Sequence, residues 1–349
     1  MTQLLSSNDP WKTDELTFPR SGRLQDQLAF CVNYAVLAPS IHNTQPWLFR
    51  PLDDAIEIFA DRSRQLPVTD PDGREMMISC GAALTNLIIA INHFGYEGWV
   101  QYRPEPGNPD LLARVRIGRS RVADHWDESL FRSILRRRSV RRPFQLRPIP
   151  RDLQRRLIWL ASEYTCWVHF VESEADRSRI ATFVEEAHHQ QLQNPAYQAE
   201  RSSWIGSGDH RSRNGSTRGS SDETGAPDVT RSTSDGAALE TGKVWQERDR
   251  DLIQSSPSLF VLGTSGDSPL DWLRAGEAIQ RIILLIESDN ISASFLNQPC
   301  QIPELREQVR RMSGRSGPPQ LILRIGYNTG VGSPTSRRPT SDVIMPQQP

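Results

Sequence analysis

The chain has 349 residues, which is long for one compact domain and ample for two intertwined halves. It contains 41 lysine and arginine residues against 42 aspartate and glutamate residues, a net charge of −1. This balance argues against a nucleic-acid-binding protein, whose binding domain is usually basic overall.

Residues 1–13 are polar and lack the apolar stretch of a secretory signal. The longest apolar runs, residues 84–91 and 282–286, are too short to span a bilayer. The four cysteines show neither a Cys-x-x-Cys pair nor metal-ligand spacing. We therefore expect a cytoplasmic protein with reduced thiols, no metal site and no membrane contact.

The most informative segment is residues 38–47, which read Ala-Pro-Ser-Ile-His-Asn-Thr-Gln-Pro-Trp. Apolar residues at three- and four-residue spacing between Leu24 and Val36 predict an amphipathic helix before it. Pro39 ends that helix, because the residue before a proline is disfavoured in the α region. A plain helix-to-strand connection would explain a lone Pro-Ser pair. The 38–47 loop, however, is crowded with hydrogen-bonding side chains.

Residues 78–90 and 273–285 form a weak internal repeat. Both place a glycine before small residues near the start of an apolar helix, where close helix packing needs no side chain. Strand patterns follow each copy, at residues 99–102 and 111–117 in the first and 292–296 and 320–326 in the second. Because a glycine before an apolar helix is common, the repeat suggests a duplication without establishing it.

A second informative segment, residues 136–144, reads Arg-Arg-Arg-Ser-Val-Arg-Arg-Pro-Phe and follows an amphipathic helical pattern at residues 130–135. Arginine makes bidentate, charge-assisted hydrogen bonds to phosphate oxygens, and a serine hydroxyl can add another. The segment therefore suits a phosphate monoester. A solvated basic face or a nucleic-acid patch would be the alternatives, and the net charge disfavours the second.

Residues 206–242 are dominated by Ser, Gly, Thr, Arg and Asp. Such a composition cannot bury enough surface to offset the entropy of ordering, so we expect a flexible segment, either a lid or an insertion. The neighbouring pair His188 and His189 has no carboxylate or thiol at ligand spacing, which favours a surface pair over a metal site.

Taken in this order, the segments resemble the nitroreductase superfamily, most closely its single-chain Acg-like branch of FMN-binding, nitroreductase-like proteins. The 38–47 loop is similar to the flavin-facing loop of that superfamily, and Arg137-Arg138-Ser139-x-Arg141 to its FMN-phosphate element. Further matching pieces are Asp70-Pro71 with Arg74, and residues 271–277, 295–299, 319–327 and 337–339.

The resemblance implies an α+β, nitroreductase-like fold, with central, mostly antiparallel sheets flanked by helices. In ordinary nitroreductases the Arg-Arg-Ser element precedes the flavin-facing loop, whereas here it follows it at a distance. This inversion implies two fused halves, residues 1–125 and 126–349, that form a pseudo-dimer around one composite site. We expect a monomer with one FMN.

The same resemblance implies a site without a catalytic side chain, because the chemistry belongs to the flavin. The phosphate would be held by Arg137, Arg138, Ser139 and Arg141, aided by Arg337 and Arg338. The ring and ribityl chain would be bordered by Pro39, Ser40, His42, Asn43 and Gln45. The residues Asn297, Gln298 and Pro299 would present backbone to the flavin N5 edge.

Three functions remain open on the sequence. The first is an FMN-dependent oxidoreductase that uses NAD(P)H to reduce a nitroaromatic, a quinone or a similar small-molecule acceptor. The second is a protein that binds or sequesters FMN with little or no turnover. The third is a scaffold that has lost flavin. The lack of a Gly-x-Gly-x-x-Gly motif does not exclude NAD(P)H, since nitroreductases stack the nicotinamide on the flavin.

Overall fold

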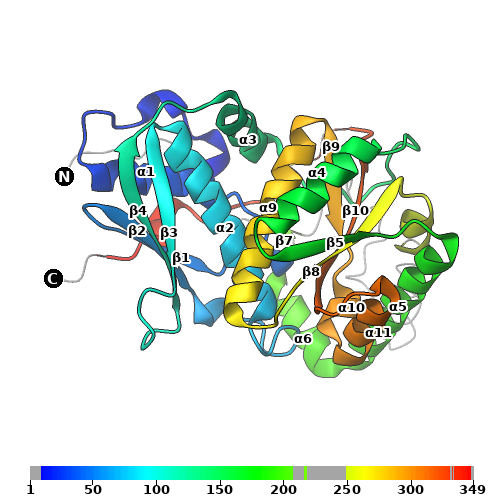
Figure 1. Ribbon diagram of the computed structural model, residues 1–349. Coiled ribbons are helices and arrows are strands. Elements are labelled where there is room, and N and C mark those ends of the chain that lie inside the picture. Colours follow the sequence, from blue (N-terminus) through cyan, green and yellow to red (C-terminus); the bar gives the residue numbers. More distant parts are fainter. Residues whose placement is uncertain (1–8, 207–215, 218–248, 331, 333, 347–349) are drawn as a thin grey trace.

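The computed structural model describes residues 9–206, 216–217, 249–330, 332 and 334–346 (Figure 1). Almost all of the segment at 206–242 lies outside these residues, so the expected lid or insertion stays a prediction. Within the described residues the chain forms two four-stranded antiparallel sheets with helices packed against them.

The first sheet has the strand order β1-β2-β4-β3. Its strands are β1 (Trp47–Pro51), β2 (Ala55–Ala60), β3 (Tyr96–Tyr102) and β4 (Leu111–Ser120). Every neighbouring pair is antiparallel. Strand β2, one of the sheet's two interior strands, is buried along its whole length.

The second sheet repeats this connectivity, with the order β5-β8-β10-β9. Its strands are β5 (Cys166–Phe170), β8 (Ser258–Thr264), β9 (Ile291–Phe295) and β10 (Pro319–Tyr327). In both sheets a long helix separates the second strand from the third along the chain. A short parallel pair, β6 (Ile205–Gly206) and β7 (Ser216–Thr217), stands apart.

The helices flank both sheets (Figure 1). They are α1 (Leu24–Ala35), α2 (Arg74–His93), α3 (His125–Arg136), α4 (Arg151–Ser162), α5 (Glu174–Gln193), α6 (Pro195–Trp204), α9 (Pro269–Ser288), α10 (Gln298–Gln301) and α11 (Pro303–Ser313). Short 3₁₀ turns are η1 (Pro10–Lys12), η2 (Glu15–Thr17), η3 (Ile41–Asn43), η4 (Arg62–Arg64) and η7 (Thr340–Asp342). The predicted α+β architecture with two antiparallel halves is confirmed.

Helices α2 and α9 cross at the centre of the molecule, and each crosses at a glycine (Figure 1). A Cβ on Gly81 would lie 2.0 Å from the carbonyl oxygen of Leu273. A Cβ on Gly276 would likewise lie 2.0 Å from the carbonyl oxygen of Ile78. The two backbones are therefore in direct contact, as the repeat predicted.

Helix α2 is also long and apolar enough to cross a membrane by length and composition, with a mean hydropathy of 1.4 over its best window. The sequence had suggested that the apolar runs are too short for this. In the structure 89% of that window is buried against other parts of the protein, which explains its composition.

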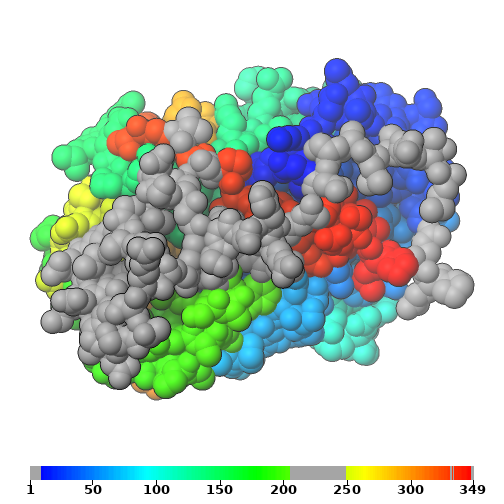
Figure 2. All heavy atoms as spheres, turned by 180° about the vertical axis from the view of Figure 1, so that it is seen from behind, coloured from blue at the N-terminus to red at the C-terminus, as the bar shows by residue number. Residues whose placement is uncertain are grey.

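Two segments that follow regular elements pair with edge strands of the sheets. Beyond β10 the chain returns to β1, where the amide of Phe49 donates to Val343 and the amide of Met345 to Phe49, both at 2.7 Å. Within the second half, the amide of Val140, which follows α3, donates to the carbonyl oxygen of Ala293 in β9 at 3.1 Å. On the face shown in Figure 2, the C-terminal segment (red) lies against residues from the start of the chain (blue).

Helix α3 follows the predicted boundary at residues 125 and 126, yet it packs on both α2 and α9. The division of the chain at that position stays a prediction.

We expect Gly81→Ala to destabilise the protein, because the added methyl group meets the backbone of α9. Overpacking of this kind costs about 1–3 kcal/mol. Urea denaturation would measure the change in the free energy of unfolding. Gly107→Ala is the matched control, since a Cβ there has no neighbour within 4 Å. Equal effects of the two substitutions would contradict the close helix contact.

Candidate functional site

The 38–47 loop has an unusual backbone. His42, Asn43 and Gln45 have φ angles of +46°, +55° and +52°, a region that non-glycine residues rarely adopt. Such conformations persist only where the surroundings impose them. Within the loop, the Ser40 hydroxyl accepts a hydrogen bond from the amide of Gln45 at 2.9 Å.

Two arginines from distant segments hold the start of this loop. Arg137, just beyond α3, and Arg337, in the C-terminal segment, both donate to the carbonyl oxygen of Leu37, at 3.4 and 3.3 Å. Arg337 also donates to the Ala38 carbonyl at 3.3 Å and to Oδ1 of Asn43 at 3.1 Å. Residues predicted for the phosphate and residues predicted for the ring are thus in direct contact.

A third arginine completes this arginine cluster, which we define as Arg137, Arg138 and Arg337. The guanidinium of Arg138 lies 4.1 Å from the ring centroid of Trp11, and that of Arg337 lies 5.2 Å from the same ring. The indole of Trp11 donates to the Thr335 carbonyl at 2.7 Å. An aromatic face stabilises adjacent cations without neutralising them.

The arginine cluster concentrates positive charge in the protein interior. Arg137 and Arg337 are only 3% and 5% exposed. Burial, and then the neighbouring Arg138, lowers the pKa of Arg137 to about 10. Burial, followed by Arg137 and Arg138, lowers the pKa of Arg337 well below its ordinary value. Glu287 on α9 partly offsets the charge on Arg137.

Each of these two buried arginines also has an unsatisfied donor. The Nε atoms of Arg137 and Arg337 are buried and have no hydrogen-bond partner among the described residues. A buried charge is costly unless it is paired, and a buried donor is costly unless it is bonded. A bound oxyanion with several acceptor oxygens would satisfy both needs, and a phosphate monoester has this chemistry.

Arg338 is placed differently from the other arginines. Its amide donates to Oε1 of Gln45 at 2.8 Å, and its Nη1 donates to the Gln45 carbonyl at 3.1 Å and to Asp61 at 3.2 Å. Its Nη2 donates to the Asp342 carbonyl at 2.8 Å. These contacts give Arg338 a role in positioning the 38–47 loop.

The remaining residues of the Arg-Arg-Ser element face outwards. Ser139 is exposed, forms a bridge with Ala293 of β9, and accepts a 3.5 Å contact from Nη1 of Arg137. Arg141 is also exposed, and its charge acts on His42 of the 38–47 loop.

The predicted N5-edge residues lie at the start of α10. Oδ1 of Asn297 accepts from the amide of Ile322 at 3.2 Å, and Pro299 is buried. Gln298 lies 3.4 Å from His188, which also pairs with Asp249 at 2.9 Å. The described contacts do not join these three residues to the arginine cluster.

His188 is half-buried in this setting, so the expected surface pair was wrong for its first member. Helix α10 packs on α5, the helix that carries His188. The sequence of α5 does not predict this neighbour. No group of three or more potential metal ligands occurs within the described residues. All four cysteines are free and buried.

Two contributors to the site were missed on the sequence. Trp11 stands in a polar segment without a motif, and only its aromatic character beside Pro10 distinguished it. Helix α6 packs on η3 within the 38–47 loop, although more than 150 residues separate them along the chain. A contact at this separation has no local sequence signal.

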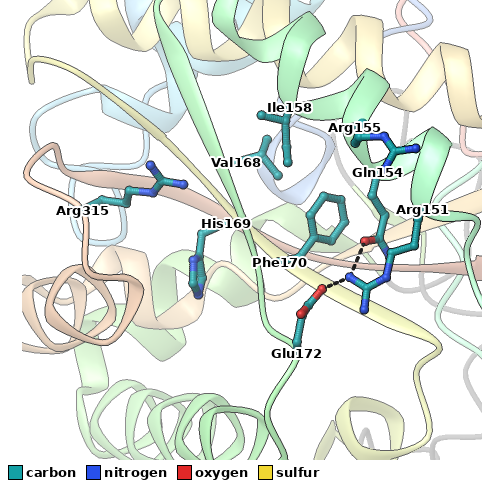
Figure 3. Close-up of a pocket in the computed structure, with 9 residues that line it drawn as sticks. All are labelled: Arg151, Gln154, Arg155, Ile158, Val168, His169, Phe170, Glu172 and Arg315. Carbon is teal, nitrogen blue, oxygen red and sulfur yellow. Dashed lines mark hydrogen bonds and ion pairs between the residues drawn. The ribbon is translucent and has the colours of Figure 1, made fainter.

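A cavity of about 320 Å³ lies elsewhere, between α4 and the outer edge strand β5 (Figure 3). Ile158, Val168 and Phe170 give it an apolar part, and Arg151 at its rim donates to Glu172 and Gln154 (Figure 3). None of the predicted site residues lines this cavity.

Comparison with known proteins identifies the family. The chain is 31% identical over 320 residues to "Putative NAD(P)H nitroreductase Rv3131" of Mycobacterium tuberculosis, which covers 89% of this chain and 88% of the relative. The chain belongs to the nitroreductase family. It is also 24% identical over 332 residues to "Putative NAD(P)H nitroreductase acg" of the same organism, covering 91% of this chain and 95% of that protein. The resemblance predicted from the motifs is confirmed.

Solved structures show a weaker likeness. The FMN-dependent nitroreductase NfnB from Mycobacterium smegmatis, solved in complex with NADPH, aligns with a TM-score of 0.39 and 16% identity. The alignment covers 64% of this chain and 95% of that one. No model of a protein family matches the chain.

We expect Arg338→Ala to destabilise the flavin-free protein, because the largely buried Asp61 loses its ionic partner. Breaking a buried ion pair costs about 3–5 kcal/mol. Arg119→Ala is the control: it breaks an ion pair with Glu97 whose arginine side chain is 84% exposed, and exposed pairs contribute about 1 kcal/mol or less. Urea denaturation would measure the free energy of unfolding of both variants. An unchanged unfolding free energy for Arg338→Ala would mean that the arginine is free to serve a ligand.

Proposed function

We propose that this chain binds one FMN in a composite site between its halves and acts as an NAD(P)H-dependent oxidoreductase. Its acceptor would be a nitroaromatic, a quinone or a similar small molecule. The observation that carries the proposal is the buried arginine cluster with its two unsatisfied Nε donors. Membership of the nitroreductase family supports the same function, since both relatives carry the name of an NAD(P)H nitroreductase.

The residues present fit FMN. The phosphate would be held by Arg137, Arg138, Ser139, Arg141 and Arg337, and Arg338 would fix the 38–47 loop through Gln45. Pro39, Ser40, His42, Asn43 and Gln45 would border the ring and the ribityl chain. Asn297, Gln298 and Pro299 would lie at the N5 edge. When bound, FMN supplies the redox chemistry, and the protein binds, orients and shields it.

The two halves supply opposite sides of this site, so one chain is sufficient. Matching strand orders and the reciprocal glycines of α2 and α9 support an internal duplication with halves near residues 1–125 and 126–349. Four buried free cysteines are consistent with a reduced, cytoplasmic location. We propose a monomer that works as a pseudo-dimer, with no nucleic-acid or membrane partner.

Storage of FMN with little turnover is the second candidate. It is favoured by α6, which covers part of the 38–47 loop and could restrict the approach of a nicotinamide. The two functions differ in whether a reductant reaches the bound flavin.

An anaerobic spectrum separates the two candidates. If the protein is a reductase, NADPH should bleach the visible band of the bound flavin, and a quinone or a nitroaromatic should restore it. Bleaching by dithionite alone would instead support storage. Failure of the purified protein to take up FMN would refute both.

We expect Arg137→Gln to weaken FMN binding about tenfold to a hundredfold, because it removes charge-assisted hydrogen bonds to the phosphate. Riboflavin has no phosphate, so its affinity should change little. Fluorescence titration of both ligands would measure the difference. Arg132→Gln, an exposed position on α3, is the control. Equal weakening of FMN and riboflavin would show that Arg137 is structural.

A further inference from the structure

Strand β5 has one free side. It stands first in the order β5-β8-β10-β9, so β8 is its only neighbour among the described strands. An edge strand leaves every second amide and carbonyl group without a partner in the sheet. Such groups can pair with another extended chain. The cavity between α4 and β5 lies along this free side (Figure 3).

The register identifies the residues that face the free side. The amide of Val171, just beyond β5, donates to the carbonyl oxygen of Leu259 at 2.8 Å. Along an antiparallel pair, residues that bond to the neighbouring strand alternate with residues whose amide and carbonyl face away from it. Since Val171 bonds to Leu259, the backbone groups of Phe170 and Val168 face away from β8. Two amides and two carbonyl groups therefore point to the free side, at the spacing that a strand partner requires.

The face of β5 that α4 covers is apolar. Val168 and Phe170 pack into the core on this face, and Ile158 of α4, which is 43% exposed, lines the cavity with them. The next residue of α4, Trp159, is 62% exposed. Exposed apolar side chains that gather at one place mark an interaction site, whereas scattered ones do not. This face of the strand suits an apolar side chain of a partner.

The opposite face of β5 is cationic. Side chains alternate along a strand, so His169 lies on the other face from Val168 and Phe170. Arg315, in the turn after α11, lines the cavity on the same side as His169 (Figure 3). Neither of these two side chains has a hydrogen bond or an ion pair within the described part of the chain. Burial, and then Arg315, lowers the pKa of His169, as a nearby cation should.

The charges around the cavity are unbalanced. Its lining holds three arginines, Arg151, Arg155 and Arg315, and one carboxylate, Glu172. Arg151 pairs with Glu172 and Arg155 with Asp152, which leaves the charge of Arg315 uncompensated. An acidic group is thus the complement that the site lacks. A second copy of the chain, paired through its own β5, would instead bring like charges together.

We propose that the free edge of β5 docks an extended segment of a partner protein in which apolar and acidic residues alternate. The segment adds a strand to the sheet through the backbone of Val168 and Phe170. Its apolar side chains lie beside Ile158, and the acidic side chain between them lies against His169 and Arg315. Main-chain hydrogen bonds give such a complex its affinity, and the alternating side chains give it specificity. The inference does not depend on FMN binding, because none of the residues proposed for FMN lines this cavity.

Peptide titrations of the full chain test the inference. The probe is the peptide Ac-Glu-Val-Glu-Val-Glu-NH₂, whose two valines match the spacing of Val168 and Phe170. The assigned amide NMR signals of these two residues should shift saturably as the peptide is added. The same peptide N-methylated at both valines cannot donate to the strand and should not bind. A peptide with lysine in place of glutamate should bind at least about tenfold more weakly, since it meets Arg315 with a like charge.

Protein variants separate recognition from folding. Arg315→Glu should weaken the acidic peptide about tenfold or more and strengthen binding of the lysine peptide, a reversal that loss of folding cannot produce. Ile158→Ser should weaken the acidic peptide, because it removes the exposed apolar side chain beside the strand. Arg119→Glu on β4 is the control: this arginine side chain is 84% exposed in the other sheet, and its change should have no effect.

Three results would overturn the inference. The first is that the acidic peptide leaves the signals of Val168 and Phe170 unchanged. The second is equal binding of the acidic, the lysine and the N-methylated peptides, which would mean that neither the strand edge nor Arg315 recognises them. The third is a dimer of the chain in light scattering whose formation shifts the same two signals, since this edge would then be an interface between two copies.

Discussion

The carbonyl oxygen of Leu37 accepts hydrogen bonds from two arginines that are 200 residues apart in the sequence, Arg137 and Arg337. This interaction joins the end of α1, the exit of α3 and the C-terminal segment at one point. It also fixes two cations next to each other in a region with little access to water. Such charge is costly without a counter-ion, so the arrangement supports the proposed binding of an anion here.

The rest of the fold holds these segments in place. The glycines of α2 and α9 allow the two helices to touch along their backbones, which brings the two sheets to opposite sides of one core. The segments that pair with β1 and β9 then carry Arg337 and Arg137 towards the same loop. The 38–47 loop tolerates three left-handed residues because Arg337, Arg338 and Arg64 bond its backbone or side chains.

The sequence predicted much of this arrangement. The spacing of Gly81 and Gly276 within apolar helices predicted close packing, and the order of the motifs predicted two halves and a shared site. The position of Arg337 near Arg137 followed from the family resemblance alone. The motifs predict the site because the residues that form them are also the groups proposed to bind the ligand.

Other features had no local signal. The ionic partner of Arg338 is Asp61, nearly 280 residues away, and no pattern in the sequence favours this ion pair over a phosphate contact. Trp11 and α6 contribute through tertiary packing, and neither lies in a motif. The burial of His188 depends on α10. The sequence of α5, the helix that carries His188, does not predict this contact. In each case the decisive neighbour is remote along the chain.

The central claim is that both halves of one chain build a single FMN site. Titration of the flavin-free protein with FMN, combined with its molar mass in solution from light scattering, tests this claim most directly. The account predicts saturation at one FMN per chain, with a mass equal to that of one chain. Saturation at two FMN per chain, or at one FMN per two chains, would contradict it.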